Sequence, residues 1–167
     1  MRFLPLFAAL AAVAALRAEP EYPKMGPDLF DPTADGSAQI IVALTQAKAE
    51  HKNVLLMFGA NWCPWCHRLK NTMETDATVA RTLNGNYVLV LIDVNMRHGF
   101  KRNAEVNERY GNPIHEGLPV LVVLDGNGKQ LFTQESGALE EGEGHSPKKV
   151  AAFLQRWAPK PVISSRE

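Results

Sequence analysis

The sequence predicts an α/β sandwich in which helices flank a mixed central sheet. Apolar, strand-like segments alternate with segments of helical spacing, and a hairpin followed by a last helix closes the pattern. The chain has 167 residues, of which 46% are hydrophobic, and this is enough for one domain with a substantial core. No internal repeat is visible, so a single domain is expected.

The first half of the predicted domain alternates helices with two strands. Its first helix carries Ile40, Ile41, Leu44 and Ala47 at helical spacing. Its second strand, residues 87–94, is mostly apolar, as expected when helices cover both faces of a sheet. In order, we expect a helix over 36–52, a strand over 53–58, a helix opened by the cysteine motif and clearest over 67–74, a short helix over 76–83 and the strand over 87–94.

The second half adds a helix, a hairpin and a closing helix. In order, we expect a helix over 101–110, a strand over 120–124, a turn over 125–128 and a strand over 129–133. Residues 134–145 are rich in Gly and Glu and are expected to form a solvated loop. Ser146 is the expected cap of the closing helix, with Pro147 in its first turn. The predicted buried stripe of this helix is Val150, Phe153, Leu154 and Trp157.

The N-terminus has the pattern of an export signal. Arg2 precedes an apolar, alanine-rich run over 3–16 that is shorter than the ~20 residues of a membrane-spanning helix. Cleavage after Ala18 predicts a signal peptide over 1–18 and a periplasmic or otherwise exported protein; an uncleaved anchor is the alternative. Residues 19–35, rich in Pro and Gly, are expected to be an extended lead-in.

Charge argues against two classes of partner. The chain has 18 basic and 18 acidic residues, so its formal net charge is zero. Such a balance provides no electrostatic footprint for nucleic acid or for an anionic membrane.

The two cysteines of the chain lie within one short motif, Trp62-Cys63-Pro64-Trp65-Cys66-His67, between a predicted strand and a predicted helix. Exported domains often carry structural disulfides. A bond between these two residues would close almost no loop and would therefore contribute little to stability. The spacing favours a reactive pair.

Three parts of the sequence form a recognisable set: Phe58-Gly-Ala-Asn-Trp62-Cys63-Pro-Trp-Cys66, Asp93 near the end of the next strand, and Gly117-Leu118-Pro119 before the hairpin. Through these residues the chain resembles the thioredoxin superfamily, over roughly residues 36–158, which leaves 159–167 as a C-terminal tail. The resemblance implies a thioredoxin-like fold and an exported thiol-disulfide oxidoreductase whose redox-active Cys63–Cys66 disulfide needs no other cofactor.

The position of the motif predicts the roles of the two thiols. Cys63 is expected at a helix N-terminus, where free N–H groups and the helix dipole favour a thiolate, so Cys63 is the expected nucleophile. Cys66, one turn further on, is the expected resolving thiol. Pro64 lacks an N–H that the first turn does not need. Trp62 and Trp65 are expected either to line a substrate site or simply to pack.

The resemblance also implies a cis peptide bond before Pro119, facing the cysteine pair. The Leu118 backbone would then pair with an extended substrate, with little sequence preference. Expected partners are cysteine-containing exported polypeptides and a separate redox partner, for which a membrane-bound protein is a candidate. A monomer is expected, and the direction of electron flow stays open.

The sequence departs from thioredoxins at two positions. Met57 stands where thioredoxins carry a buried aspartate, and Leu89 stands where they carry a lysine. Another group, or water, must then take the proton from Cys66. Candidates by proximity are His67, His115 and Glu116, each of which could equally be an exposed or packing residue; the loop around His98 could also line the site.

Two other functions fit the same cysteines. Cys63-Pro-Trp-Cys66-His67 matches the attachment motif of c-type haem, with Met73 or Met96 as a further iron ligand. A copper(I) or zinc carrier could use Cys63, Cys66 and His115.

Overall fold

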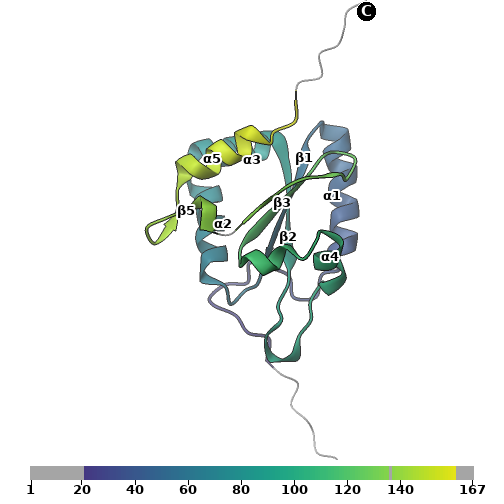
Figure 1. Ribbon diagram of the computed structural model, residues 1–167, viewed down its shortest axis with the longest axis vertical. Helices are drawn as coiled ribbons and strands as arrows, with labels where there is room; N and C mark the ends of the chain where they lie inside the picture. Colours follow the sequence, from purple (N-terminus) through teal and green to yellow (C-terminus); the bar gives the residue numbers. More distant parts are fainter. Residues whose placement is uncertain (1–20, 136, 161–167) are drawn as a thin grey trace, which may run out of the picture.

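A four-stranded mixed sheet with helices on both faces forms the centre of the structure, a computed structural model that describes residues 21–135 and 137–160 (Figure 1). The helices are α1 (Gly36–Glu50), α2 (Pro64–Thr75), α3 (Ala77–Asn86), α4 (Ala104–Arg109) and α5 (Pro147–Arg156), with short 3-10 helices η1 (Arg97–Gly99), η2 (Pro113–Glu116) and η3 (Gly137–Leu139). The strands are β1 (Asn53–Gly59), β2 (Tyr87–Asp93), β3 (Val120–Leu124), β4 (Gln130–Gln134), β5 (Glu140–Glu141) and β6 (Gly144–His145). The predicted mixed sheet flanked by helices is thus confirmed.

The sheet has the strand order β2-β1-β3-β4. β1 pairs in parallel with β2 and antiparallel with β3, and β3 pairs antiparallel with β4. Every residue of β1 is buried, because this strand lies inside the sheet with helices on both faces. In the β1–β2 pair Gly59 lies beside Asp93, so both strands end at the same edge of the sheet.

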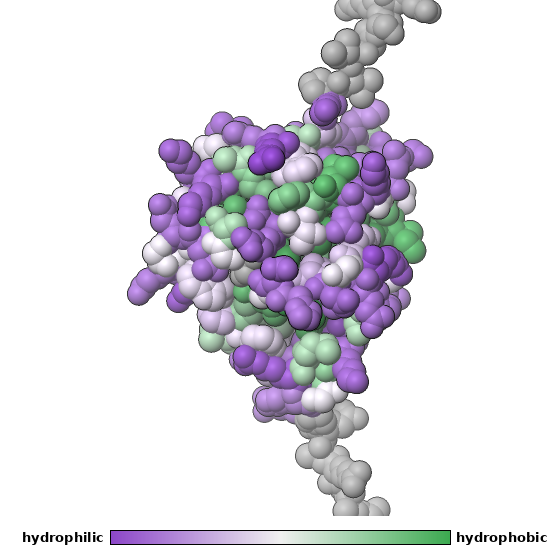
Figure 2. All heavy atoms as spheres, in the orientation of Figure 1, coloured by the Kyte–Doolittle hydropathy of each residue, from purple (hydrophilic) through white to green (hydrophobic). Residues whose placement is uncertain are grey.

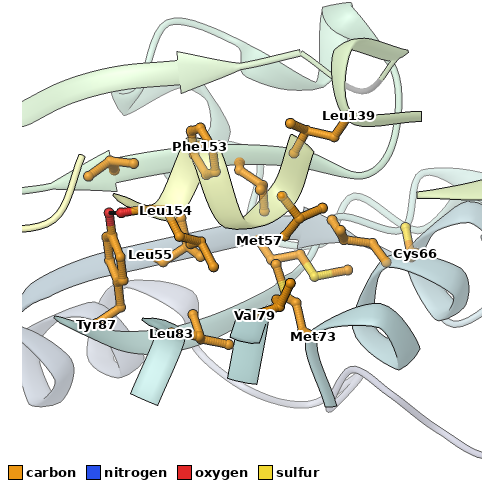
Figure 3. Close-up of a cluster of buried hydrophobic side chains, with 14 of the residues drawn as sticks. Leu55, Met57, Cys66, Met73, Val79, Leu83, Tyr87, Leu139, Phe153 and Leu154 are labelled. Carbon is orange, nitrogen blue, oxygen red and sulfur yellow. Dashed lines mark hydrogen bonds between the residues drawn. The ribbon is translucent and has the colours of Figure 1, made fainter. Parts of the chain in front are cut away.

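Side chains of β1 alternate between two apolar clusters, one on each face of the sheet. Leu55 and Met57 belong to the cluster formed with α2, α3 and α5, which contains both cysteines. Val54, Leu56 and Phe58 belong to the cluster formed with α1 and α4. Figure 3 shows the first cluster, with Cys66 at one side of it and Tyr87 at the other.

Capping residues define where several helices begin. The Asp35 carboxylate accepts hydrogen bonds from two N–H groups in the first turn of α1, and Asp76 does the same for α3. Cys63 is the N-cap of α2, and Pro64 follows in the first turn. Ser146 is the N-cap residue of α5, as expected, but its side chain makes no capping hydrogen bond.

The structure corrects the prediction of a solvated loop over 134–145. Within the described part of this segment β5 pairs with β6, and Leu139 and His145 are buried. These two side chains occupy apolar surroundings that composition alone does not reveal, because the segment around them is rich in Gly and Glu.

Two helices also differ in detail from the prediction. α4 begins at Ala104 rather than at 101, because Asn103 has a left-handed backbone conformation that interrupts the helix. In α1, Ile41 is 65% exposed and Val42 is 68% exposed. The buried stripe of α1 consists instead of Ile40, Ala43 and Ala47, and apolar surface is visible on the side of the molecule where α1 lies (Figure 2).

The predicted signal peptide over 1–18 lies outside the described residues, as does most of the predicted tail over 159–167. Of the lead-in, residues 21–35 form neither helix nor strand, and Phe30 is buried. Within the described ranges no helix combines the length and the apolar character needed to cross a membrane.

Candidate functional site

The cysteine pair lies between the end of β1 and the start of α2. After Gly59 the chain turns, and the Cys63 N–H donates to the Ala60 carbonyl oxygen at 2.9 Å. Cys63 and Cys66 form a disulfide, with their Cα atoms 5.3 Å apart. Cys63 is 3% exposed and Cys66 is fully buried, so Cys63 is the more accessible sulfur.

Backbone groups of α2 point at Cys63. The Cys66 N–H donates to the Cys63 Sγ at 3.1 Å, and the Cys63 carbonyl oxygen accepts from the N–H groups of Cys66 and His67. An N–H donor and the positive end of the helix dipole both stabilise negative charge at this sulfur. The arrangement favours Cys63 as the thiolate when the disulfide is reduced.

Trp62 joins the motif to the loop that follows β2. Its indole N–H donates to the Asn95 Oδ1 at 2.8 Å, and the same oxygen accepts from the Arg97 N–H at 3.0 Å. The Arg97 guanidinium lies 3.4 Å from the centre of the Trp62 ring, within cation–π range. This loop therefore borders the site through Asn95 and Arg97, while His98 is exposed.

Trp65 joins the motif to the β5–β6 pair. Its ring lies edge to face with the ring of His145 at 5.6 Å, and the Arg68 guanidinium lies 4.6 Å from the centre of the Trp65 ring. His145 is 6% exposed, and neither of its ring nitrogens has a hydrogen-bond partner. Burial, reinforced by the positive charge of Arg68, lowers the pKa of His145 to about 4. His145 is therefore neutral near pH 7.

Leu118 and Pro119 enter β3 directly after η2. The Leu118–Pro119 peptide bond is cis, as the resemblance to thioredoxins implies. Pro119 is buried, and Leu118 is half-buried and packs against the cluster that contains both cysteines. Gly117 precedes them with a φ of 95°, a conformation that favours glycine. Contact of these residues with a substrate stays a prediction.

The candidate proton acceptors for Cys66 differ in their exposure to solvent and in their contacts. The Nε2 atom of His67 lies 2.9 Å from the Asn61 carbonyl oxygen, while His115 and Glu116 are exposed. Met57 is fully buried in the cluster with Cys66, so the thioredoxin carboxylate is replaced by an apolar side chain. Leu89 packs against the same cluster.

Asp93 is a buried carboxyl at this edge of the sheet. It is 1% exposed, and burial raises its pKa, an effect that Tyr22, the Asn95 N–H and Arg102 oppose. The Asn95 N–H lies 3.3 Å from Asp93 Oδ1, and Arg102 Nε lies 3.7 Å from Asp93 Oδ2.

The ligand set of the metal-carrier alternative is not assembled. Within residues 21–135 and 137–160, no three or more His, Cys, Asp or Glu side chains are grouped closely enough to hold a metal ion. His115 is thus not brought to the cysteine pair.

Sequence reasoning did not find Asn61, Asn95, Arg97 or His145. Asn61 and Asn95 are fully buried amides, and Arg97 and His145 contact the two tryptophans of the motif. The position of Asn61 directly before the motif was a usable signal, because an amide side chain in a buried turn needs hydrogen-bond partners. No local pattern marks the other three.

A family model described as a thioredoxin-like domain matches residues 41–143, which is more than half of the chain. The chain belongs to the thioredoxin-like family. Together with the fold and the Cys63–Cys66 disulfide, this makes it a thioredoxin-fold, oxidoreductase-like protein with a redox-capable disulfide.

Solved structures agree with this assignment. A disulphide isomerase from Xylella fastidiosa Temecula1 is 32% identical, with a TM-score of 0.69 over 79% of this chain and 98% of that chain. The C-terminal domain of Neisseria meningitidis DsbD, in its oxidised form, is 20% identical, with a TM-score of 0.55 over 74% of this chain and 97% of that chain. The DsbD domain shows the fold alone.

A curated relative of a different size matches a short segment. Spermatogenesis-associated protein 20 of Mus musculus is 33% identical over 51 residues, which are 30% of this chain and 6% of the mouse protein. This chain therefore matches only a small part of that protein.

Proposed function

We propose that this thioredoxin-like protein exchanges disulfides with exported, cysteine-containing polypeptides through Cys63 and Cys66. The observation that carries the proposal is the asymmetry of the two sulfurs. Cys63 is slightly exposed and receives the Cys66 N–H at the start of α2, whereas Cys66 is fully buried. Thiol-disulfide exchange needs one accessible thiolate and one protected thiol that acts second.

In the reducing direction the Cys63 thiolate attacks one sulfur of a substrate disulfide. A Cys63–substrate disulfide forms, and the other substrate sulfur leaves as a thiolate and takes up a proton. Cys66 then loses its proton and attacks the Cys63 Sγ, which re-forms the Cys63–Cys66 disulfide and releases the second substrate thiolate. Two electrons have then passed to the substrate, and the oxidising direction is the reverse sequence.

Substrate binding in this proposal involves Trp62, Pro64, Trp65, Leu118 and Pro119. The two tryptophans lie on either side of Cys63 in the sequence and are half-buried. Export is supported by Arg2 and the apolar run over 3–16. An exported protein would exchange electrons with a separate redox partner, for which a membrane-bound protein is a candidate. The 32% identity to a disulphide isomerase supports the same chemistry.

A trapping experiment tests the proposal. Cys66→Ser removes the second thiol, so the mixed disulfide between Cys63 and a substrate should accumulate. We expect disulfide-linked complexes with exported proteins and with a defined disulfide peptide on non-reducing gels, and reductant should abolish them. The matched control is Cys63→Ser, which should trap neither.

Two outcomes contradict the proposal. If Cys63→Ser traps the peptide and Cys66→Ser does not, the roles of the two thiols are reversed. If neither variant traps it, and the unmodified protein neither reduces insulin nor oxidises a dithiol peptide, disulfide exchange is not its function.

A further inference from the structure

Residues 25–30, hereafter the 25–30 segment, are attached to the cysteine motif through Asn61. The Asn61 Oδ1 accepts from the N–H groups of Leu29 at 2.8 Å and Phe30 at 2.7 Å, and its Nδ2 donates to the Phe30 carbonyl oxygen at 2.8 Å. The Met25 N–H donates to the Asn61 carbonyl oxygen at 2.8 Å. These bonds join the 25–30 segment to Asn61, which lies about thirty positions further along the chain and two places before Cys63. Asn61 is fully buried.

The attachment brings the ring of Phe30 to the sulfur of Cys66. Phe30 is 1% exposed and belongs to the apolar cluster that contains both cysteines. A Cβ atom added to Gly59 would lie 2.7 Å from the Cys66 Sγ and 3.0 Å from Cε2 of the Phe30 ring. The Phe30 ring and the Cys66 sulfur therefore both lie close to Gly59, where a side chain would have to displace one of them.

Cys66 belongs to an apolar cluster that also contains Phe30 and Met57. Both side chains are almost fully buried in the same cluster. The Cys66 N–H donates to the Cys63 Sγ, so this hydrogen bond stabilises charge on the Cys63 sulfur and not on the Cys66 sulfur. Apolar surroundings raise the pKa of a thiol, because the thiolate loses its hydration there.

We propose that Phe30 is a positioning residue of the redox site: it covers the Cys66 sulfur, so that Cys63 alone meets substrates and Cys66 acts only within the protein. Phe30 precedes the family match, which begins at residue 41. The effect of Phe30 on the reaction rests on the proposed disulfide exchange, but its effect on the Cys66 thiol can be measured without that exchange.

The cover acts on the second step of the reaction. In that step the Cys66 thiolate attacks the Cys63 Sγ, the bond between Cys63 and the substrate breaks, and the substrate leaves as a thiolate that takes up a proton. Formation of the Cys66 thiolate is disfavoured while Phe30 excludes water from it. Phe30 therefore lengthens the lifetime of the mixed disulfide and protects Cys66 from outside thiols.

Alkylation of Cys66 tests the cover directly. In the full chain carrying Cys63→Ser, Cys66 is a single thiol whose reaction with iodoacetamide can be followed against pH. We expect Phe30→Ala to accelerate this reaction about tenfold at neutral pH and to shift its pH profile toward lower pH, because water reaches the sulfur. Phe30→Leu, which keeps apolar bulk, should restore most of the protection.

The matched control is Phe153→Ala in the same background. Phe153 is a buried aromatic side chain of the same cluster, but it lies on α5, and its ring contacts that of Phe132. Its loss should leave the pH profile of Cys66 unchanged. Thermal unfolding of each variant confirms that it is folded at the assay temperature.

Three results would overturn the inference. They are an unchanged alkylation rate in Phe30→Ala, equal acceleration in Phe153→Ala, and no protection in Phe30→Leu. Failure of the unmodified protein to exchange disulfides would instead contradict the proposed function, since alkylation of Cys66 needs no substrate and no turnover.

Discussion

Cys66 is fully buried in a cluster of apolar side chains. Met57 is fully buried in the same cluster, at the position where thioredoxins carry a buried aspartate. A carboxylate there would accept the proton that Cys66 must lose before it attacks the mixed disulfide. An apolar side chain makes that proton transfer depend on water or on a more distant group.

The substitution Met57→Asp should therefore accelerate release of the mixed disulfide near neutral pH. We expect a rate increase of about a hundredfold, at the lower end of the range of general acid–base catalysis. The buried carboxyl should also lower the free energy of unfolding by about 3 kcal/mol. Stopped-flow measurement of substrate release, with urea unfolding in parallel, checks both effects.

Met57→Leu is the control for this experiment, because it keeps the apolar volume and adds no acid. Its release rate should equal that of the unmodified protein. Equal rates in Met57→Asp and Met57→Leu would mean that residue 57 does not act on the Cys66 proton, or that proton transfer does not limit release.

At the scale of single residues, the sequence predicted what local spacing encodes. Cys63 and Cys66 are three residues apart between a strand and a helix, and that pattern alone indicated a redox pair and the more reactive sulfur. Asn61 and Trp62 act through residues 31 to 33 positions away in the chain. Pairs so far apart leave no periodic trace, so Phe30 and Asn95 could not be found as parts of the site.

At the scale of elements, the N-cap residues of α3 and α5 differ in how much their side chains stabilise the helix. Asp76 begins α3, and its Oδ1 accepts from the Thr78 N–H at 3.0 Å and the Val79 N–H at 2.9 Å. Ser146 occupies the same position of α5, but its side chain makes no capping hydrogen bond. A side chain at an N-cap stabilises a helix only when it satisfies N–H groups of the first turn.

We therefore expect Asp76→Ala to lower the free energy of unfolding by about 1 kcal/mol. Ser146→Ala should change it by less than about 0.5 kcal/mol, although a Ser N-cap would ordinarily contribute as much as an Asp. Urea unfolding of the two single variants checks the difference. Equal losses would mean that Ser146 caps α5 in solution.

Elements differed in how well the sequence predicted them. β1 and β3 are continuous apolar runs buried on both faces, and such runs are visible without any knowledge of their partners. β5 and β6 have two residues each, too few for any hydrophobic period to show. The sequence therefore predicts a loop here and does not indicate the position of His145 beside Trp65.

At the scale of the whole molecule, the site lies where separate parts of the chain meet at the end of β1. The 25–30 segment reaches it through Asn61, the loop after β2 through Trp62, and the β5–β6 pair through Trp65. Because each part is held by a side chain of residues 61–65, the stability of the fold and the geometry of the site are linked. Burial and the positive charge of Arg68 lower the pKa of His145, one of the residues in these contacts, to about 4.

Protonation of His145 should destabilise the folded protein in acid. Its pKa is lowered to about 4 when folded, by burial and by Arg68, against about 6.5 in the unfolded chain. Between these values the unfolded chain binds the proton and the folded protein does not. The contribution of His145 is therefore complete above about pH 6.5 and is lost as the pH falls toward 4, by up to about 3 kcal/mol. Glu140 lies opposite His145 in the β5–β6 pair and carries the nearest charge on that strand.

Asp93 has the opposite effect on how the free energy of unfolding changes with pH. Burial raises its pKa above the unfolded value, so its protonation in acid favours the folded state and its ionisation at higher pH opposes it. The acid dependence of the unmodified protein alone is therefore a sum of opposing effects. A comparison between two proteins that both keep Asp93 cancels its contribution.

The last prediction uses that comparison. His145→Phe keeps a ring beside Trp65 but removes the titrating group, so its free energy of unfolding should fall less between pH 7 and pH 4.5 than that of the unmodified protein, by roughly 2 kcal/mol. His115→Gln, which removes an exposed histidine, should follow the unmodified protein. Urea unfolding of the three proteins at both pH values measures the differences. Parallel losses in all three would mean that His145 titrates normally in the folded state, and that the β5–β6 pair opens to water while the rest of the domain stays folded.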